Sequence, residues 1–116
     1  MAKKTGNPIH GWVNLDKPIG ISSAKAVSTV RRVFNAAKAG HGGTLDPLAS
    51  GVLPIALGEA TKTVSFAMGQ QKSYEFELVW GFETATDDAE GKIVRESSCR
   101  PDDAAIDAAL LNFHGY

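Results

Sequence analysis

Residues 39–58 read AGHGGTLDPLASGVLPIALG and contain one charged side chain, Asp46. Three glycines lie shortly before this carboxylate, at Gly40, Gly42 and Gly43. Glycine removes side-chain bulk, so another backbone or a ligand can come close. The apolar run that follows, residues 52–57, predicts a short buried strand, and Pro54 within it indicates an edge position or a bulge. The sequence therefore predicts a loop that carries an acid and leads into a core strand.

The residues alone leave two interpretations of Asp46 open. With Pro47 after it and Gly51 beyond, Asp46 is a good N-cap for a single helical turn. An acid at a helix N-terminus, among small and aliphatic residues, is also held ionised, which suits a nucleophile or general base. The only other polar side chains before it in the loop are His41 and Thr44. No second histidine or acid stands at metal-ligand spacing, and the Gly-Lys-Ser/Thr ending of a phosphate loop is missing, so we expect neither a metal nor a nucleoside triphosphate.

Upstream of the loop, the pattern predicts a strand, a turn and a helix. Residues 11–18, GWVNLDKP, begin with alternating apolar residues, Trp12, Val13 and Leu15, and lead into the turn KPIG. Ser22 or Ser23 can cap a helix that runs to about Ala37. Its apolar stripe is Val27, Val30, Phe34 and Ala37. Its basic residues are left to solvent or a partner: Lys25, Arg31, Arg32 and, just beyond it, Lys38.

Downstream, residues 58–69 predict a short helix whose inward residues are Val64, Ala67 and Met68. Residues 72–80, KSYEFELVW, alternate most regularly and predict a strand that pairs with residues 92–96 across a polar connection. A last helix begins at Pro101 with Asp102 or Asp103 as its cap. Its apolar stripe is Ile106, Ala109, Leu110 and Phe113, and Gly115 stands where a C-cap belongs.

These elements predict an α+β fold, a mixed but mainly antiparallel sheet with flanking helices, because they show no strict strand-helix-strand alternation. The 116 residues are enough for one domain, in which we expect residues 1–9 to be flexible. Cys99 is the only cysteine, so an internal disulfide is excluded and a reducing, cytoplasmic setting fits. No stretch is apolar enough to span a membrane.

Charge divides the chain into a basic and an acidic part. Residues 1–72 carry nine Lys or Arg and three acids, whereas residues 73–116 carry three Lys or Arg and ten acids. Such an asymmetry favours a polyanion as the partner of the first part. The alternative is that the two parts neutralise each other in the fold.

Several motifs in this order resemble the TruB family of pseudouridine synthases. They are LDKPIGISS (15–23), AGHGGTLDPLASGVLPIALGEATK (39–62) and KSYEFELVWGFETATDDAEG (72–91), and the likeness covers nearly everything after residue 10. The complete loop looks more like the stand-alone bacterial branch than like the guide-RNA-dependent relatives. The resemblance implies the catalytic fold of pseudouridine synthases, of which residues 10–116 would be the N-terminal part.

The resemblance also implies a reaction and a site. The reaction is isomerisation of uridine 55 in the T arm of tRNA, with Asp46 as the catalytic carboxylate after the base is flipped out. In the family, a histidine at the position of His41 contacts the T loop and a tyrosine at that of Tyr74 packs on the base. By its spacing alone, Tyr74 would instead be an aromatic residue of the core. Lys17 would orient the loop, Gly42, Gly43 and Thr44 would lie against the substrate, and phosphates would be met by Lys25, Arg31, Arg32, Lys38 and Lys62.

Because the isomerisation conserves all atoms and electrons, the resemblance implies no metal and no organic cofactor. It implies tRNA as the partner, with no protein partner required and a monomeric state for the full-length protein. The family's catalytic domain continues well beyond 116 residues, through an arginine that pairs with the catalytic aspartate. We therefore expect a polypeptide of this length to be poorly active or inactive alone. The main alternative is a non-catalytic RNA-binding or tRNA-folding module on the same scaffold, and a guide-RNA-dependent synthase or an unrelated interaction domain remain further alternatives.

Overall fold

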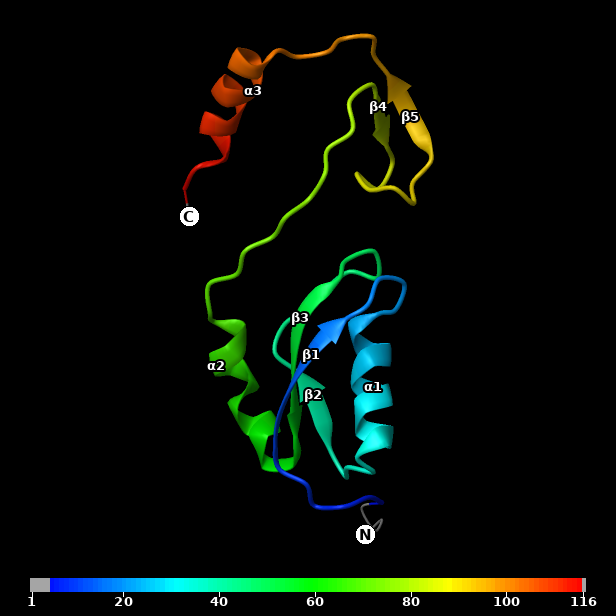
Figure 1. The fold of residues 1–116 in the computed structure, drawn as a ribbon, viewed down its shortest axis with the longest axis vertical. Helices are drawn as coiled ribbons and strands as arrows, with labels where there is room; N and C mark the ends of the chain where they lie inside the picture. The colour runs from blue at the N-terminus through cyan, green and yellow to red at the C-terminus, as the bar shows by residue number, and fades with distance from the viewer. Residues whose placement is uncertain (1–4, 116) are drawn as a thin grey trace. The chain divides into compact units, whose positions relative to one another are not determined.

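The computed structural model describes residues 5–115, which belong to two units, one ending at Lys72 and one beginning at Ser73. The first unit contains a three-stranded antiparallel sheet with helices, and the second contains a two-stranded antiparallel hairpin followed by a helix (Figure 1). The predicted α+β class with mainly antiparallel pairing is therefore confirmed.

The sheet of the first unit has the strand order β1-β3-β2. The elements of this unit are β1 (Gly11–Lys17), α1 (Ser23–Val33), β2 (Ala39–His41), β3 (Gly51–Leu57), the 3-10 helix η1 (Gly58–Thr63) and α2 (Val64–Met68). The predicted strands around β1 and β3 are confirmed. The short strand β2 was not predicted, because three residues in a glycine-rich stretch carry no periodic signal.

The core of this unit lies between α1 and one face of the sheet. The buried residues are Ala26, Val30, Ala36, Leu53, Ile55 and Leu57. In register, Val13 of β1 faces Ile55 of β3 and Leu15 faces Leu53, so alternate residues of both strands meet on the core face. Trp12 lies on the opposite face of β1 and is 45% exposed, although it was predicted to alternate with Leu15 in a single apolar pattern.

Helix α1 begins as predicted but ends earlier. The hydroxyl of Ser22 accepts from the backbone N–H of Lys25 at 3.1 Å, so Ser22 is the N-cap. The predicted end near Ala37 is wrong, because Asn35 adopts a left-handed φ of 48° and stops the helix. The N–H groups of Asn35 and Ala36 return to carbonyls of the last turn, a Schellman arrangement that satisfies the helix end.

Pro54 lies in the central strand, so the prediction of an edge position or a bulge is wrong. The Pro54 carbonyl accepts from the Gly42 N–H at 2.9 Å on the side of β2. The N–H and C=O groups of a strand residue point to the same side, and Pro54 has no N–H to donate on that side. Its neighbour there is Gly42, one residue beyond the end of β2. The proline thus stops the β2–β3 pairing at the point where the loop 42–50 leaves the sheet.

The single helix predicted over residues 58–69 is divided into η1 and α2. Val64 and Ala67 are half-buried as predicted, whereas Met68 is 56% exposed. Ala67 packs against Gly42, where an added Cβ would lie 2.8 Å from the Ala67 Cβ. This contact places α2 next to the beginning of the loop.

In the second unit, β4 (Phe82–Thr84) pairs with β5 (Ile93–Glu96), with a register shift between Glu83 and Thr84. A hairpin is therefore present, but the prediction that its first strand covers residues 72–80 is wrong. Residues 71–79 form no strand, and residues 72–80 are exposed throughout. Alternation shows only which residues share a face, and a strand also needs a neighbour for its backbone groups, which the described residues do not supply here.

The last helix, α3 (Asp103–Leu110), is capped by Asp102, whose Oδ1 accepts from the Ala105 N–H at 2.8 Å. It continues into the 3-10 helix η2 (Leu111–Phe113), so Gly115 is not its C-cap and that prediction is wrong. Of the segment 1–9, residues 1–4 lie outside the described residues, as does Tyr116. Asn7 forms a parallel bridge with Ala36.

Candidate functional site

Asp46 lies in the loop 42–50 that joins β2 to β3. Its carbonyl accepts from the Ala49 N–H at 2.9 Å, which closes one turn, but the loop contains no helix. The Asp46 side chain is exposed and takes part in no hydrogen bond or ion pair with residues 5–115. The predicted helix start is therefore wrong, and the carboxylate does not act as a cap.

The two neighbours of Asp46 are held by buried or backbone contacts. The hydroxyl of Ser23 accepts from the Leu45 N–H at 2.9 Å and donates to the Leu45 carbonyl at 2.9 Å. On the other side, the Gly20 N–H donates to the Pro47 carbonyl at 2.7 Å. Ser23 is 3% exposed. The backbone on both sides of the carboxylate is thus tied to the segment 18–23.

Lys17 is hydrogen-bonded to this segment. Its side chain is fully buried, and its ammonium group donates to the carbonyls of Pro18 at 2.9 Å and Ile21 at 2.8 Å. A buried ammonium needs such acceptors, because an unpaired buried charge is costly. Lys17 therefore holds the turn whose Gly20 reaches the loop, which agrees with an orienting role and not with a surface contact.

The other predicted loop residues precede Asp46 in sequence and differ in their exposure. His41 ends β2, is half-buried, and has its Nδ1 2.7 Å from the Gly43 carbonyl. A carbonyl only accepts, so Nδ1 is the donor in this hydrogen bond. Gly42 is buried, Gly43 has a left-handed φ of 133°, and Thr44 is exposed.

Tyr74, by contrast, belongs to the second unit. It lies in the unpaired stretch before β4 and is 65% exposed. Hydrogen bonds of the first unit connect Lys17 to the segment 18–23, and that segment to Leu45 and Pro47 on either side of Asp46. They do not include Tyr74.

The basic residues predicted to meet phosphates are spread over the first unit. Helix α1 contains Lys25, Arg31 and Arg32 and no acid. Lys62 forms an ion pair with Glu59 across one helical turn. The hydrogen bond and the charge of Lys62 hold the pKa of the Glu59 carboxyl below its usual 4.5.

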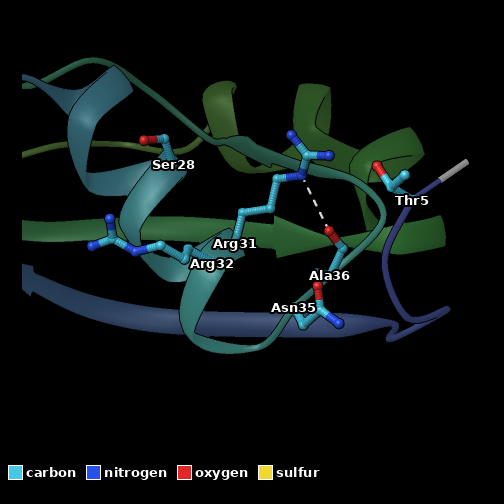
Figure 2. Close-up of a pocket in the computed structure, with 6 residues that line it drawn as sticks. All are labelled: Thr5, Ser28, Arg31, Arg32, Asn35 and Ala36. Carbon is cyan, nitrogen blue, oxygen red and sulfur yellow. Dashed lines mark hydrogen bonds between the residues drawn. The ribbon is translucent and has the colours of Figure 1, made fainter.

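Two of these residues line a hollow of about 210 Å³ at the C-terminal end of α1. We call it the arginine hollow; its residues are Thr5, Ser28, Arg31, Arg32, Asn35 and Ala36 (Figure 2). The Arg31 Nε donates to the Ala36 carbonyl at 3.1 Å, which directs this guanidinium toward Thr5, whereas Arg32 points away from it. No carboxylate lines the hollow, and neither arginine is in an ion pair with another described residue. The hollow thus carries the positive charge of two guanidinium groups, of which Arg31 is also engaged with the Ala36 and Ala37 carbonyls.

Sequence reasoning missed Ser23 as part of the site. It assigned the pair Ser22–Ser23 to capping, although one helix has one N-cap position. The presence of a second serine next to the capping one was the only sign in the sequence of a further role. It does not identify the partner, because Leu45 is 22 residues away.

Residues 5–115 contain no group of three His, Cys, Asp or Glu side chains arranged to hold a metal ion. None of their helices combines the length and the apolar character that crossing a membrane requires.

Comparison with known proteins gives a consistent result. The family described as "TruB family pseudouridylate synthase (N terminal domain)" matches residues 31–116. A protein of Agrobacterium fabrum named tRNA pseudouridine synthase B is 56% identical over 113 residues, which is 97% of this chain and 36% of that protein. Proteins of the same name from Paracoccus denitrificans (56%, covering 99% and 39%) and Bradyrhizobium diazoefficiens (59%, covering 92% and 31%) are similar to the same extent. The chain thus spans between 31% and 39% of the length of these relatives.

One solved structure also resembles the chain. It is described as an H/ACA RNP bound to a substrate RNA containing 2′-deoxyuridine. The likeness has a TM-score of 0.47 at 40% identity, and it covers 57% of this chain and 24% of that one.

Proposed function

Because the chain belongs to the TruB family of pseudouridylate synthases, we propose that it takes part in converting uridine to pseudouridine in tRNA, with Asp46 as the catalytic carboxylate. The observation that carries the assignment of Asp46 is its setting. Its side chain is exposed and has no hydrogen-bond or ion-pair partner among residues 5–115, while the backbone on both sides of it is fixed by Ser23 and Gly20. A group that is held in place but not used by the fold is available for a substrate.

The reaction is an isomerisation. The bond between ribose C1′ and uracil N1 breaks, a bond from C1′ to C5 forms, the C5 proton leaves and N1 gains a proton. Atoms and electrons balance without an oxidant, so the proposal needs no cofactor. An ionised carboxylate can attack C1′, attack the uracil ring or remove a ribose proton, and all three routes require the same placement of Asp46.

The substrate we propose is uridine 55 in the T arm, flipped out of its stack at a cost of about a few kcal/mol. His41 is half-buried beside the loop, and its Nδ1 is engaged with the Gly43 carbonyl, so Nε2 is the ring nitrogen that we expect to meet the RNA. Gly43 and the exposed Thr44 let the nucleotide approach, whereas the buried Gly42 lets α2 pack against the loop behind them. Tyr74 offers an exposed ring on which a base can stack.

Contacts to the RNA backbone would come from the arginine hollow together with Lys25, Lys38 and Lys62. Basic side chains supply affinity and register through phosphates, not base choice. Each phosphate contact that is lost should lower the slope of log K against log salt by about 1. Arg31→Gln and Arg32→Gln should each do so for tRNA binding, while Arg95→Gln, which removes a cross-strand ion pair with Glu83 in the second unit, should leave the slope unchanged. Equal slopes in all three variants would refute the hollow as an RNA contact.

Asp46→Asn tests the chemistry. The complete gene product is prepared unaltered and as the Asp46→Asn variant, and each is incubated with tRNA tritiated at uridine C5. Release of tritium reports isomerisation because C5 loses its hydrogen. We expect release to stop while tRNA affinity stays within about twofold, since Asn keeps the shape of the side chain. Release at the unmodified rate would refute Asp46 as the catalytic group.

The alternative is an RNA-binding or tRNA-folding module without catalytic activity. The basic first unit and the arginine hollow are also consistent with this function. In that case the unaltered protein binds tRNA and releases no tritium. We further propose that the protein acts in the cytoplasm as a monomer, with tRNA as its partner and without an obligatory protein partner.

A further inference from the structure

We propose that Ser23 is a positioning residue that fixes the direction in which Asp46 leaves its loop. The proposal rests on the proposed function in taking Asp46 as the group to be positioned. Ser23 itself is 3% exposed, and its hydroxyl is engaged with Leu45, so it acts on Asp46 through the backbone and not on the substrate.

One hydroxyl engages both backbone groups of one residue. A serine oxygen has one proton to donate and lone pairs to accept with, and here the Leu45 carbonyl takes the proton and the Leu45 N–H uses a lone pair, both at 2.9 Å. The N–H belongs to the peptide plane before Leu45 and the carbonyl to the plane after it. Because both planes are bonded to the same atom, φ and ψ of Leu45 are fixed together.

The following residues leave Asp46 little other freedom. Its next neighbour is Pro47, and a residue before proline is restricted to extended backbone. The Pro47 carbonyl in turn accepts from the Gly20 N–H at 2.7 Å. Asp46 therefore stands between a residue fixed by a side chain and a residue fixed by its own ring and a backbone hydrogen bond.

The anchor is rigid. Ser23 is the first residue of α1, and the same helix contributes Ala26 and Val30 to the buried core. Lys17 stabilises the turn between β1 and α1 through its hydrogen bonds to the carbonyls of Pro18 and Ile21. A carboxylate held by a helix and a sheet keeps its geometry better than one held by loop contacts alone.

Adjacent serines provide a matched pair of variants. Ser22→Ala removes the N-cap of α1 and leaves Leu45 untouched, whereas Ser23→Ala removes both bonds to Leu45 and leaves the cap. Amide order parameters from NMR relaxation measure the loop directly. For Leu45 and Asp46 we expect about 0.85 in the unaltered protein and in Ser22→Ala, and below about 0.6 in Ser23→Ala. Values for Ser23→Ala that match the unaltered protein would overturn the proposal.

The second test measures the steady-state kinetics of the complete gene product and of its Ser23 variants. Misplacement of a catalytic group by about 1 Å can cost 10²-fold, so we expect kcat to fall by about ten- to a hundredfold in Ser23→Ala with KM changed less than about threefold. Ser23→Thr, which keeps the hydroxyl, should regain most of the loss. A lower order parameter with unchanged kcat would also overturn the proposal. If Asp46→Asn keeps its activity, the proposed function fails instead, and the order parameters still decide whether Ser23 fixes the loop.

Discussion

Replacing Gly42 with alanine should destabilise the first unit by about 1–3 kcal/mol through overpacking. Gly42 is buried, and an added Cβ would lie 2.8 Å from the Ala67 Cβ and 3.4 Å from the Pro54 Cγ. Non-bonded carbon atoms prefer about 3.5–4.0 Å, so α2 and the loop must separate by roughly 1 Å. The glycine at this position is required by the space available, because its φ is not in the left-handed region.

The cause of the loss is tested by removing the opposing methyl group. Ala67→Gly alone should cost about 0.5–1 kcal/mol, as glycine does within a helix. In the double variant Gly42→Ala/Ala67→Gly the 2.8 Å contact is gone, so the two losses should not add and a favourable coupling of about 1–2 kcal/mol should remain.

Urea denaturation followed by circular dichroism gives these free energies of unfolding. Gly69→Ala is the control within the same region, because its methyl would meet nothing closer than 3.6 Å, and it should be neutral or slightly stabilising. Additive losses in the double variant would show that the Gly42–Ala67 contact is not the cause and would refute the packing of α2 on the loop.

Three further predictions concern exposed acids. The hydrogen bond and charge of Lys62 lower the pKa of Glu59, so Lys62→Gln should return that pKa toward 4.5 in a carboxyl NMR titration; the small stability that the pair adds is present above pH 4.5 and is lost as the pH falls through the lowered pKa. The hydroxyl of Thr86 is the main cause of the lowered pKa of Asp88, so Thr86→Val should raise that pKa toward 3.8, and no change would exclude the hydrogen bond in solution. Asp46→Ala should change the free energy of unfolding by less than about 0.5 kcal/mol, because an exposed side chain without partners contributes little; loss of a cap would instead cost about 0.5–2 kcal/mol.

Local signals predicted the beginnings of elements better than their ends. Ser22 begins α1 as a capping serine should, and Asp102 begins α3 in the same way. The end of α1 depends on Asn35 adopting a left-handed conformation and on two backbone bonds that close over the last turn. Asparagine tolerates that conformation without requiring it, so the apolar stripe through Phe34 and Ala37 suggested a helix one turn too long.

Pro54 shows where a sound rule gives the wrong position. A proline in a strand needs a side without a neighbour, and the rule equates such a side with an edge. In β3 the free side exists only locally, because β2 is three residues long and ends at His41. The length of a partner strand cannot be read from the strand that contains the proline.

The alternation of residues 72–80 was the most regular pattern in the chain and yet formed no strand. Tyr74, Phe76 and Trp80 are all more than 40% exposed, and no described strand lies alongside them. Alternation is a property of one segment, whereas pairing is a property of two. The predicted strand is therefore wrong, and the position of the Tyr74 ring toward a substrate stays a prediction.

For the site, the sequence located the acid but not what holds it. A carboxylate among glycines is visible in the sequence because both belong to one loop. The bond between Ser23 and Leu45 joins residues 22 apart and becomes visible only when α1 and the loop are placed against the same core. Long-range side-chain contacts to backbone leave no local pattern.

The same contacts argue against a purely structural role for Asp46. If the acid served the fold, its oxygens would accept backbone N–H groups or meet a cation, as Asp102 and Glu59 do. The described loop instead uses Ser23 and Gly20 to fix the residues on either side and leaves the carboxylate exposed. Ordering two residues costs conformational entropy, and the two bonds to one buried hydroxyl offset part of that cost without involving the acid. The fold therefore stabilises the direction of a side chain from which it takes no stability, and this separation is expected when the carboxylate acts on a bound nucleotide.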